Sequence, residues 1–87
     1  MYAKNLQIGA YFVDSTNINS LNDLSTGIYS INNFDGNILD CPFGGVGMCI
    51  CAKQGNNYAF QIAMDYNNGI YYRHNDNSTW KSWKQII

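Results

Sequence analysis

Charged residues are scarce in this chain. Of its 87 residues, Lys and Arg together number 5 and the acids number 6, all of them Asp, so that the formal net charge is -1. Nucleic-acid binding usually needs a basic surface that faces the phosphates, and so few cations argue against that class. Asn, in contrast, occurs 13 times. We expect an amide-rich surface suited to neutral polyols or to a neighbouring subunit, although an A/T-rich genome would also enrich Asn.

Groups for catalysis are few as well. The single histidine, His74, lies in a polar stretch that indicates a loop, where a solvated side chain is more usual than a catalytic base. The Asp residues are scattered over loops and strand ends, as turn-forming Asp usually is. A glycan depolymerase would need two carboxylates about 5 to 10 Å apart in one cleft, and the sequence singles out no such pair. We expect no enzyme activity and no cofactor.

Cysteine is too sparse and too irregular for a disulfide framework. Cys41, Cys49 and Cys51 are an odd number, and the last two lie on the same side of any strand, too close in sequence to bridge easily. A zinc site would need a further ligand at suitable spacing, and His74 is far away in the sequence. The run Asn75–Asn77 lacks the spacing of a calcium loop. We therefore expect buried free thiols and no metal.

Long hydrophobic runs and long helical patterns are absent. The uninterrupted apolar runs span only a few residues, so we expect no signal peptide, no membrane insertion and a soluble chain made in a reducing cytoplasm. The Gly44–Gly47 stretch is followed by neither Lys-Ser nor Lys-Thr, which argues against a phosphate loop. A chain of this length suits one domain, whose small core would gain stability from oligomerisation.

The most informative pattern lies in the C-terminal third. In Tyr58–Asp65 bulky apolar residues alternate with small or polar ones, which predicts a half-buried strand with its apolar row on one face. Tyr66–Gly69 suits a tight hairpin turn, and Ile70–Arg73 is the expected return strand. A polar loop from His74 to Thr79 then leads to the terminal segment Trp80–Ile87.

The N-terminal third predicts short elements joined by turns. Ala10–Val13 is compatible with a strand, and Leu21–Leu24 fits one helical turn capped by Asn19 or Ser20. Ile28–Ile31 alternates, with apolar residues on both of its faces.

The middle of the chain predicts the rest of a sheet. Met48–Ala52 is apolar on both faces, as a central strand covered on both sides would be. Short connections then predict a meander of Met48–Ala52, Tyr58–Asp65 and Ile70–Arg73. The expected fold class is mainly β: a small antiparallel β-sheet meander with one short N-terminal helix or helical turn.

Taken in order, Leu21–Tyr29, the strand with Gln61, Ile70–Arg73 and Trp80–Ile86 resemble the knob domain of phage tail fibres and R-type pyocin fibres. The resemblance covers roughly residues 18–87 and implies an N-terminal connecting segment, 1–17, followed by a tail-fibre knob-like domain, 18–87. The chain departs from the family in the Cys49/Cys51 strand and in the Gly44–Gly47 insert. Positions that match the family motif are Gly27, Ile28, Tyr29, Gln61, Tyr71, Arg73, Trp80 and Trp83.

The resemblance implies a receptor-binding virion protein at the tail fibre tip, assembled as a homotrimer and directed to a bacterial surface glycan. The alternatives are a carbohydrate-binding or adhesin module of a bacterial surface protein, which exposed aromatic rings would favour, and a structural fibre spacer, which wholly buried Trp80 and Trp83 would favour. The motif rings pack in a core or between subunits in the simplest interpretation, with Arg73 stacked on a ring or salt-bridged. Loops tolerate variation, so candidate ligand contacts are Tyr66, Asn67, Asn68, His74, Asn75 and Asp76.

Overall fold

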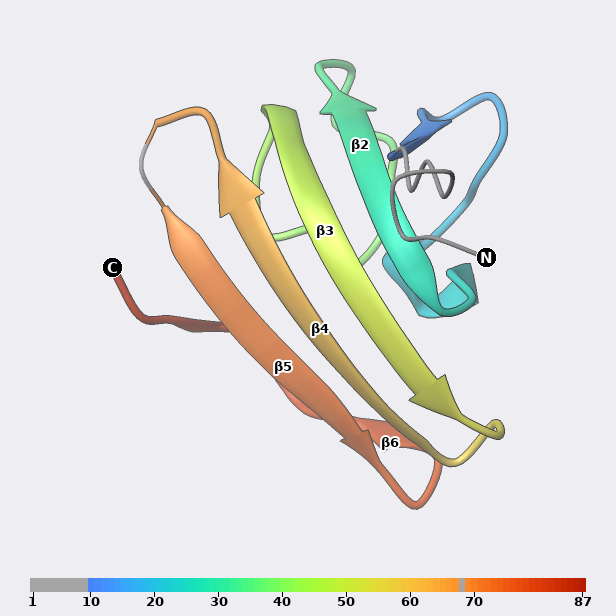
Figure 1. The fold of residues 1–87 in the computed structure, drawn as a ribbon. Coiled ribbons are helices and arrows are strands. Elements are labelled where there is room, and N and C mark those ends of the chain that lie inside the picture. Colours follow the sequence, from blue (N-terminus) through green and yellow to red (C-terminus); the bar gives the residue numbers. More distant parts are fainter. Residues whose placement is uncertain (1–9, 68) are drawn as a thin grey trace, which may run out of the picture.

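The computed structural model describes residues 10–67 and 69–87, which form a single mixed β-sheet with one helical turn (Figure 1). The predicted class, mainly β with an antiparallel meander and a short helical turn, is confirmed. Strand order follows the sequence, with the first pair parallel and the others antiparallel. The elements are β1 (Tyr11–Val13), the 3-10 turn η2 (Leu21–Asp23), β2 (Gly27–Asn33), β3 (Gly45–Gln54), β4 (Tyr58–Asp65), β5 (Ile70–Asp76), β6 (Thr79–Trp80) and β7 (Lys84–Gln85), which pairs with β5.

Local chemistry explains where these elements begin and end. Ser20 is the N-cap of η2, because its Oγ accepts a hydrogen bond of 3.0 Å from the backbone N–H of Asn22. The strand β5 runs on to Asp76 and β6 begins at Thr79, so the predicted loop from His74 to Thr79 is wrong at both ends. The turn lies at Asn77 and Ser78, whose φ angles of 52° and 70° suit a two-residue hairpin.

Tyr11–Val13, in the predicted connecting segment, belongs to the same sheet as the strands that follow it. β1 pairs with β2 in parallel, with Val13 opposite Ile31, and Val13 is buried in the core. The division of the chain after residue 17 stays a prediction.

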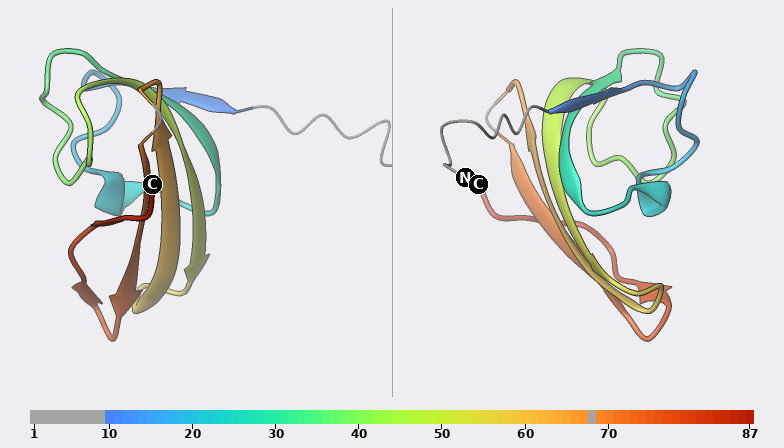
Figure 2. Two further views of the ribbon diagram at one scale, coloured as in Figure 1. Left: turned by 90° about the vertical axis from the view of Figure 1, so that its left-hand side faces the viewer. Right: turned by 45° about the vertical axis from the view of Figure 1, so that its right-hand side comes forward.

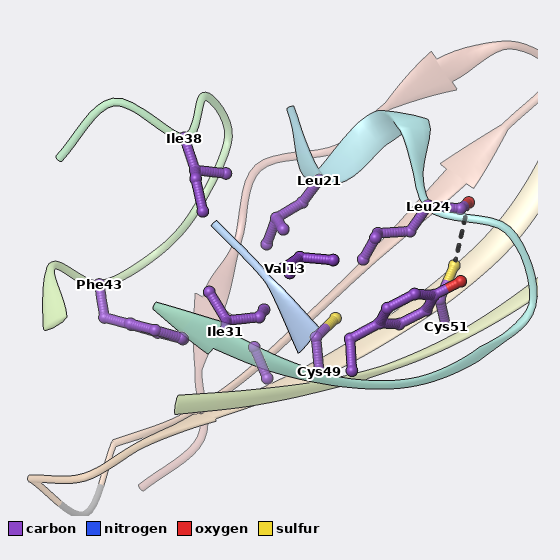
Figure 3. Close-up of a cluster of buried hydrophobic side chains, with 10 residues drawn as sticks. Val13, Leu21, Leu24, Ile31, Ile38, Phe43, Cys49 and Cys51 are labelled. Carbon is purple, nitrogen blue, oxygen red and sulfur yellow. Dashed lines mark hydrogen bonds between the residues drawn. The ribbon is translucent and has the colours of Figure 1, made fainter. Parts of the chain in front are cut away.

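The core lies on one face of the sheet. Seen edge-on, η2, the loop between β2 and β3 and the C-terminal segment all gather on that side (Figure 2). We call it the inner face and its opposite the outer face. The buried apolar cluster comprises Val13, Leu21, Leu24, Tyr29, Ile31, Ile38, Phe43, Cys49, Cys51 and Ala63 (Figure 3).

In the two central strands, small and polar side chains face inward and bulky ones face outward. Along β4, Gln61 and Ala63 are fully buried, whereas Phe60 is 67% exposed and Ile62 is 44% exposed. Half-burial of this strand is confirmed, with the buried half on the side of its small residues. The layer over the inner face lies close to the sheet: a Cβ on Gly47 would come within 2.4 Å of the Phe43 ring. Only small inward residues leave room for such a layer.

The central strand β3 is covered on one side in this chain. Cys49 and Cys51 are buried, as expected for free thiols on the same face. Met48, which precedes them, and Ile50, which lies between them, are 39% and 46% exposed on the outer face. The prediction that this strand is covered on both sides is therefore wrong for the single chain.

Candidate functional site

Several motif residues form a buried polar linkage between η2, β4 and β5. Fully buried Gln61 donates from Nε2 to the Leu21 carbonyl at 2.6 Å and accepts at Oε1 from Arg73 Nε at 2.9 Å. The Arg73 guanidinium carbon lies 4.0 Å from the Trp80 ring centroid and 4.7 Å from that of Trp83. The expected stacking of Arg73 is confirmed, and burial lowers the pKa of this guanidinium. Gln61 and Arg73 are buried, so they hold the fold together and are closed to a ligand.

Trp83 and Tyr29 complete the structural part of the motif. The Trp83 Nε1–H donates to the Asp40 carbonyl at 2.7 Å, which fixes the C-terminal segment to the β2–β3 loop. The Tyr29 hydroxyl donates to the Ser25 carbonyl at 2.9 Å. A Cβ at Gly27 would lie 3.3 Å from the Tyr29 ring, so glycine leaves space for it. Trp83, like Trp80, is half-buried.

The predicted ligand residues fall into two groups at opposite ends of the β4–β5 hairpin. Tyr66 and Asn67 follow the end of β4, whereas Asp76 pairs with Tyr58 at its beginning. His74, a predicted ligand contact, is a half-buried residue of β5 opposite Phe60. Asn68 lies outside the described residues. The structure therefore does not bring the predicted residues together in one site.

Asn75 is the least accessible member of that set. It is 7% exposed and faces inward from β5, and its Oδ1 has no hydrogen-bond partner among the described residues. This burial leaves it out of reach of a ligand on the surface.

The group around Tyr66 borders a hollow of about 350 Å³ that the sequence did not predict as a site. Its rim carries two highly exposed rings, Tyr66 at 86% and Phe34 at 75% exposed. The backbone N–H of Tyr66 donates to the Val46 carbonyl at 3.0 Å, which ties the end of β4 to β3. The volume falls within the usual range of small-molecule sites. The lining residues are Phe34, Gly44, Gly45, Val46, Asp65, Tyr66 and Asn67.

Asp65 organises the loop beside this hollow. One carboxylate oxygen accepts from the backbone N–H groups of Asn67 at 2.8 Å and Gly69 at 2.9 Å, and the other accepts from the Tyr71 hydroxyl at 2.9 Å. The Gly69 hydrogen bond is the largest cause that lowers the pKa of Asp65, and the bond from Tyr71 adds to it. Asp65 is therefore ionised at neutral pH, and both of its carboxylate oxygens accept hydrogen bonds within the loop.

The close packing of this loop leaves little freedom at its base. A Cβ at Gly69 would lie 2.4 Å from the Tyr71 hydroxyl oxygen and 2.8 Å from an Asp65 oxygen. Only glycine fits there without displacing the hydrogen bond between Tyr71 and Asp65. The exposed Tyr66 thus follows a residue, Asp65, whose carboxylate is fixed by three hydrogen bonds.

A larger hollow, of about 460 Å³, lies beside β1 and η2 and lacks an aromatic platform. Its aromatic member, Tyr29, is 7% exposed. Most of its other lining residues are Asn, Ser, Thr or Asp. Neither hollow offers the chemistry of a metal site, because no group of three or more His, Cys, Asp or Glu side chains gathers anywhere in residues 10–67 and 69–87.

Wider comparisons add no assignment. A search with protein-family models, a search of curated proteins and a search of solved structures each found no match to the chain. Within the described part of the chain, no helix has the length and apolar character needed to cross a membrane. The resemblance to tail-fibre knobs therefore rests on the sequence motif.

Proposed function

We propose that this chain is a carbohydrate-recognition module, and specifically the C-terminal knob of a phage or phage-derived tail fibre that binds a bacterial surface glycan. The observation that carries the proposal is the exposed ring pair Phe34 and Tyr66 on the rim of one hollow. In the same proposal, the chain is a virion protein made in the bacterial cytoplasm and assembled as a homotrimer at the tip of the fibre.

The chemistry of the hollow favours a sugar over other small ligands. Exposed aromatic rings offer flat apolar faces to the C–H groups of a pyranose, while their edges stay wet. Asn67 and the backbone of Gly44 and Gly45 supply donors and acceptors for hydroxyl groups. The described residues that line the hollow include no cation, so nothing in it selects an acidic sugar. We therefore expect a neutral glycan.

Catalysis at this hollow is not part of the proposal. Asp65 is the one carboxylate among its described lining residues, and glycoside hydrolysis uses two. The hydrogen bonds that lower the pKa of Asp65 also make it a poor general acid at neutral pH.

The second candidate is a carbohydrate-binding or adhesin module of a bacterial surface protein. Exposed rings on the single chain favour it as much as they favour the fibre knob, because both functions need an accessible sugar platform. A structural spacer needs no such platform and gains no support from Phe34 and Tyr66. The sequence motif alone makes the fibre knob the first choice.

Glycan binding tests the proposal directly. Wild type, Phe34→Ala and Tyr66→Ala are compared on arrays of purified envelope glycans and on intact cells of candidate hosts. Loss of a central aromatic contact costs about 2 kcal/mol or more, so we expect each variant to bind at least about thirtyfold more weakly. Phe12→Ala is the matched control, since Phe12 is 56% exposed on β1, and should bind like wild type.

Two results would contradict the proposal. Binding that survives Phe34→Ala and Tyr66→Ala but is lost in His74→Ala or Asp76→Ala would move the ligand to the opposite end of the hairpin. A wild-type chain that binds no glycan and no cell surface would leave the structural spacer as the function.

A further inference from the structure

The outer face of the sheet carries a continuous set of large apolar side chains. In register across β3, β4 and β5, Ile50 lies opposite Ile62, which lies opposite Tyr72. Met48 and Met64 form the next row. Exposure ranges from 36% for Tyr72 to 67% for Phe60. The members of the outer-face patch are Val46, Met48, Ile50, Tyr58, Phe60, Ile62, Met64 and Tyr72.

The patch lies at or above the upper end of what monomer surfaces carry. At about 150–250 Å² for each large residue, the exposed fractions of its members leave on the order of 550–900 Å² open. The largest apolar patch on a typical monomer covers about 300–600 Å². A standard stable interface buries about 800 Å² on each partner. The open area therefore matches what one copy of a stable assembly contributes.

Charge on the outer face points to a like surface as the partner. Among the described residues of β3, β4 and β5 whose side chains point outward, the one carboxylate is Asp76 at the end of β5, and there is no Lys or Arg. An acidic or basic partner would gain nothing here. Interfaces between copies of one chain are the most apolar class and have few charges at their centre.

The relief of the patch also suits pairing with itself. Phe60 projects from β4 between two shallow hollows of about 210 and 230 Å³, one toward Ala52 on β3 and the other toward His74 on β5. A ridge beside a hollow on one surface is complementary to the same ridge and hollow on a copy related by symmetry. Packed sheets interlock side chains across about 10 Å in this manner.

We infer that the outer-face patch is the surface through which this chain associates with further copies of itself. The inference rests on the assembly part of the proposed function and is independent of glycan binding. It supplies the second layer that a sheet with two apolar faces needs, since here the chain itself covers the inner face only.

The mass in solution tests the inference. Light scattering over a wide range of protein concentration compares wild type with Ile62→Lys, which puts a charge at the centre of the patch. We expect the wild type to associate and Ile62→Lys to raise the dissociation constant at least about tenfold, with an unchanged far-ultraviolet circular dichroism spectrum. Leu39→Lys is the control, because Leu39 is 63% exposed in the β2–β3 loop on the opposite side and should keep the wild-type mass.

A second variant, Ile50→Lys, keeps the test decisive if Ile62→Lys does not fold. A wild-type chain that stays monomeric at every concentration would overturn the inference and leave a different molecule as the occupant of the patch. Association that both Lys variants retain would place the interface elsewhere and overturn it too. Glycan binding of Tyr66→Ala is measured separately, so failure of the site and failure of the interface are distinguishable.

Discussion

Replacing Gln61 by Leu should destabilise the protein more than any surface change of the same kind. The substitution keeps a side chain of similar size but removes the three hydrogen bonds of the buried amide, to the Leu21 carbonyl, to the Cys51 sulfur and from Arg73 Nε. The Leu21 carbonyl keeps the bond of 3.4 Å from the Leu24 N–H, so the lost neutral bond costs about 0.5–1.5 kcal/mol, and the lost bond to a charged group costs about 1.5–3 kcal/mol. Together they predict a loss of about 2–4.5 kcal/mol, out of the roughly 5–15 kcal/mol that stabilises a small domain.

Urea unfolding followed by tryptophan fluorescence measures this loss. With a slope of about 1–1.5 kcal/mol per molar urea for a small chain, the midpoint should fall by about 1.5–4.5 M. Gln54→Leu, the same change at an exposed position at the end of β3, should shift the free energy of unfolding by less than about 0.5 kcal/mol. All variants are compared at one protein concentration, because association stabilises the folded state. Equal midpoints for Gln61→Leu and wild type would refute the reasoning.

The other predictions concern thiols and acid pH. Burial raises the pKa of Cys49 to about 12 and also raises that of Cys41, so these two native thiols react slowly. By mass spectrometry, iodoacetamide should modify half-buried Cys41 first and reach the buried Cys49 and Cys51 only in urea. Rapid native labelling of Cys49 would contradict this. Because the folded pKa of Asp65 is lowered, its carboxylate stabilises the fold above the unfolded value of about 3.9, and this contribution is lost as the pH falls through the folded pKa. Urea unfolding from about pH 5 down to pH 2 should therefore show a smaller loss for Asp65→Asn than for wild type, and parallel pH curves would contradict the role of Asp65.

Local patterns in the sequence predicted most of the strands and the cap of the helical turn. Period-two alternation located β4, and the preference of a Ser hydroxyl for the N-cap located η2. The strand β5 extends beyond its prediction because His74–Asp76 is polar, and polar residues are typical of loops. These residues nonetheless pair with Tyr58–Phe60 of β4 and so belong to the strand. Pairing with a neighbour overrides local propensity at such positions.

The candidate site was predicted in part. Tyr66 and Asn67 were expected because they lie in a hairpin turn, which is a local property. Phe34 was missed because its nearness to Tyr66 depends on two strand registers, Asn33 opposite Gly45 and Gly47 opposite Asp65. Residues that are distant in the sequence meet there only after the sheet has formed.

Alternation of apolar with small or polar residues predicts a strand with two unlike faces. It does not predict which face the chain itself covers. In β4 the apolar row was the natural choice for the core, yet the inward row holds Gln61, whose amide is needed to satisfy Leu21 and Arg73. A second apolar row left open costs solubility unless another surface covers it. The inner face is therefore the one that the chain covers when it folds, and the outer face is the one through which we infer that copies associate.

The hollow and the motif occupy different parts of the chain, and this separation bears on specificity. Gln61, Arg73 and Trp83 fasten the inner face and the C-terminal segment, and they match the tail-fibre knob motif. The hollow, in contrast, is built partly from Gly44 and Gly45, in the insert where the chain departs from that family. A φ of +110° at Gly45 favours glycine, and Phe34 passes within 3.8 Å of the position its Cβ would take. If the hollow binds the glycan, its specificity depends on residues that lie outside those that carry the resemblance.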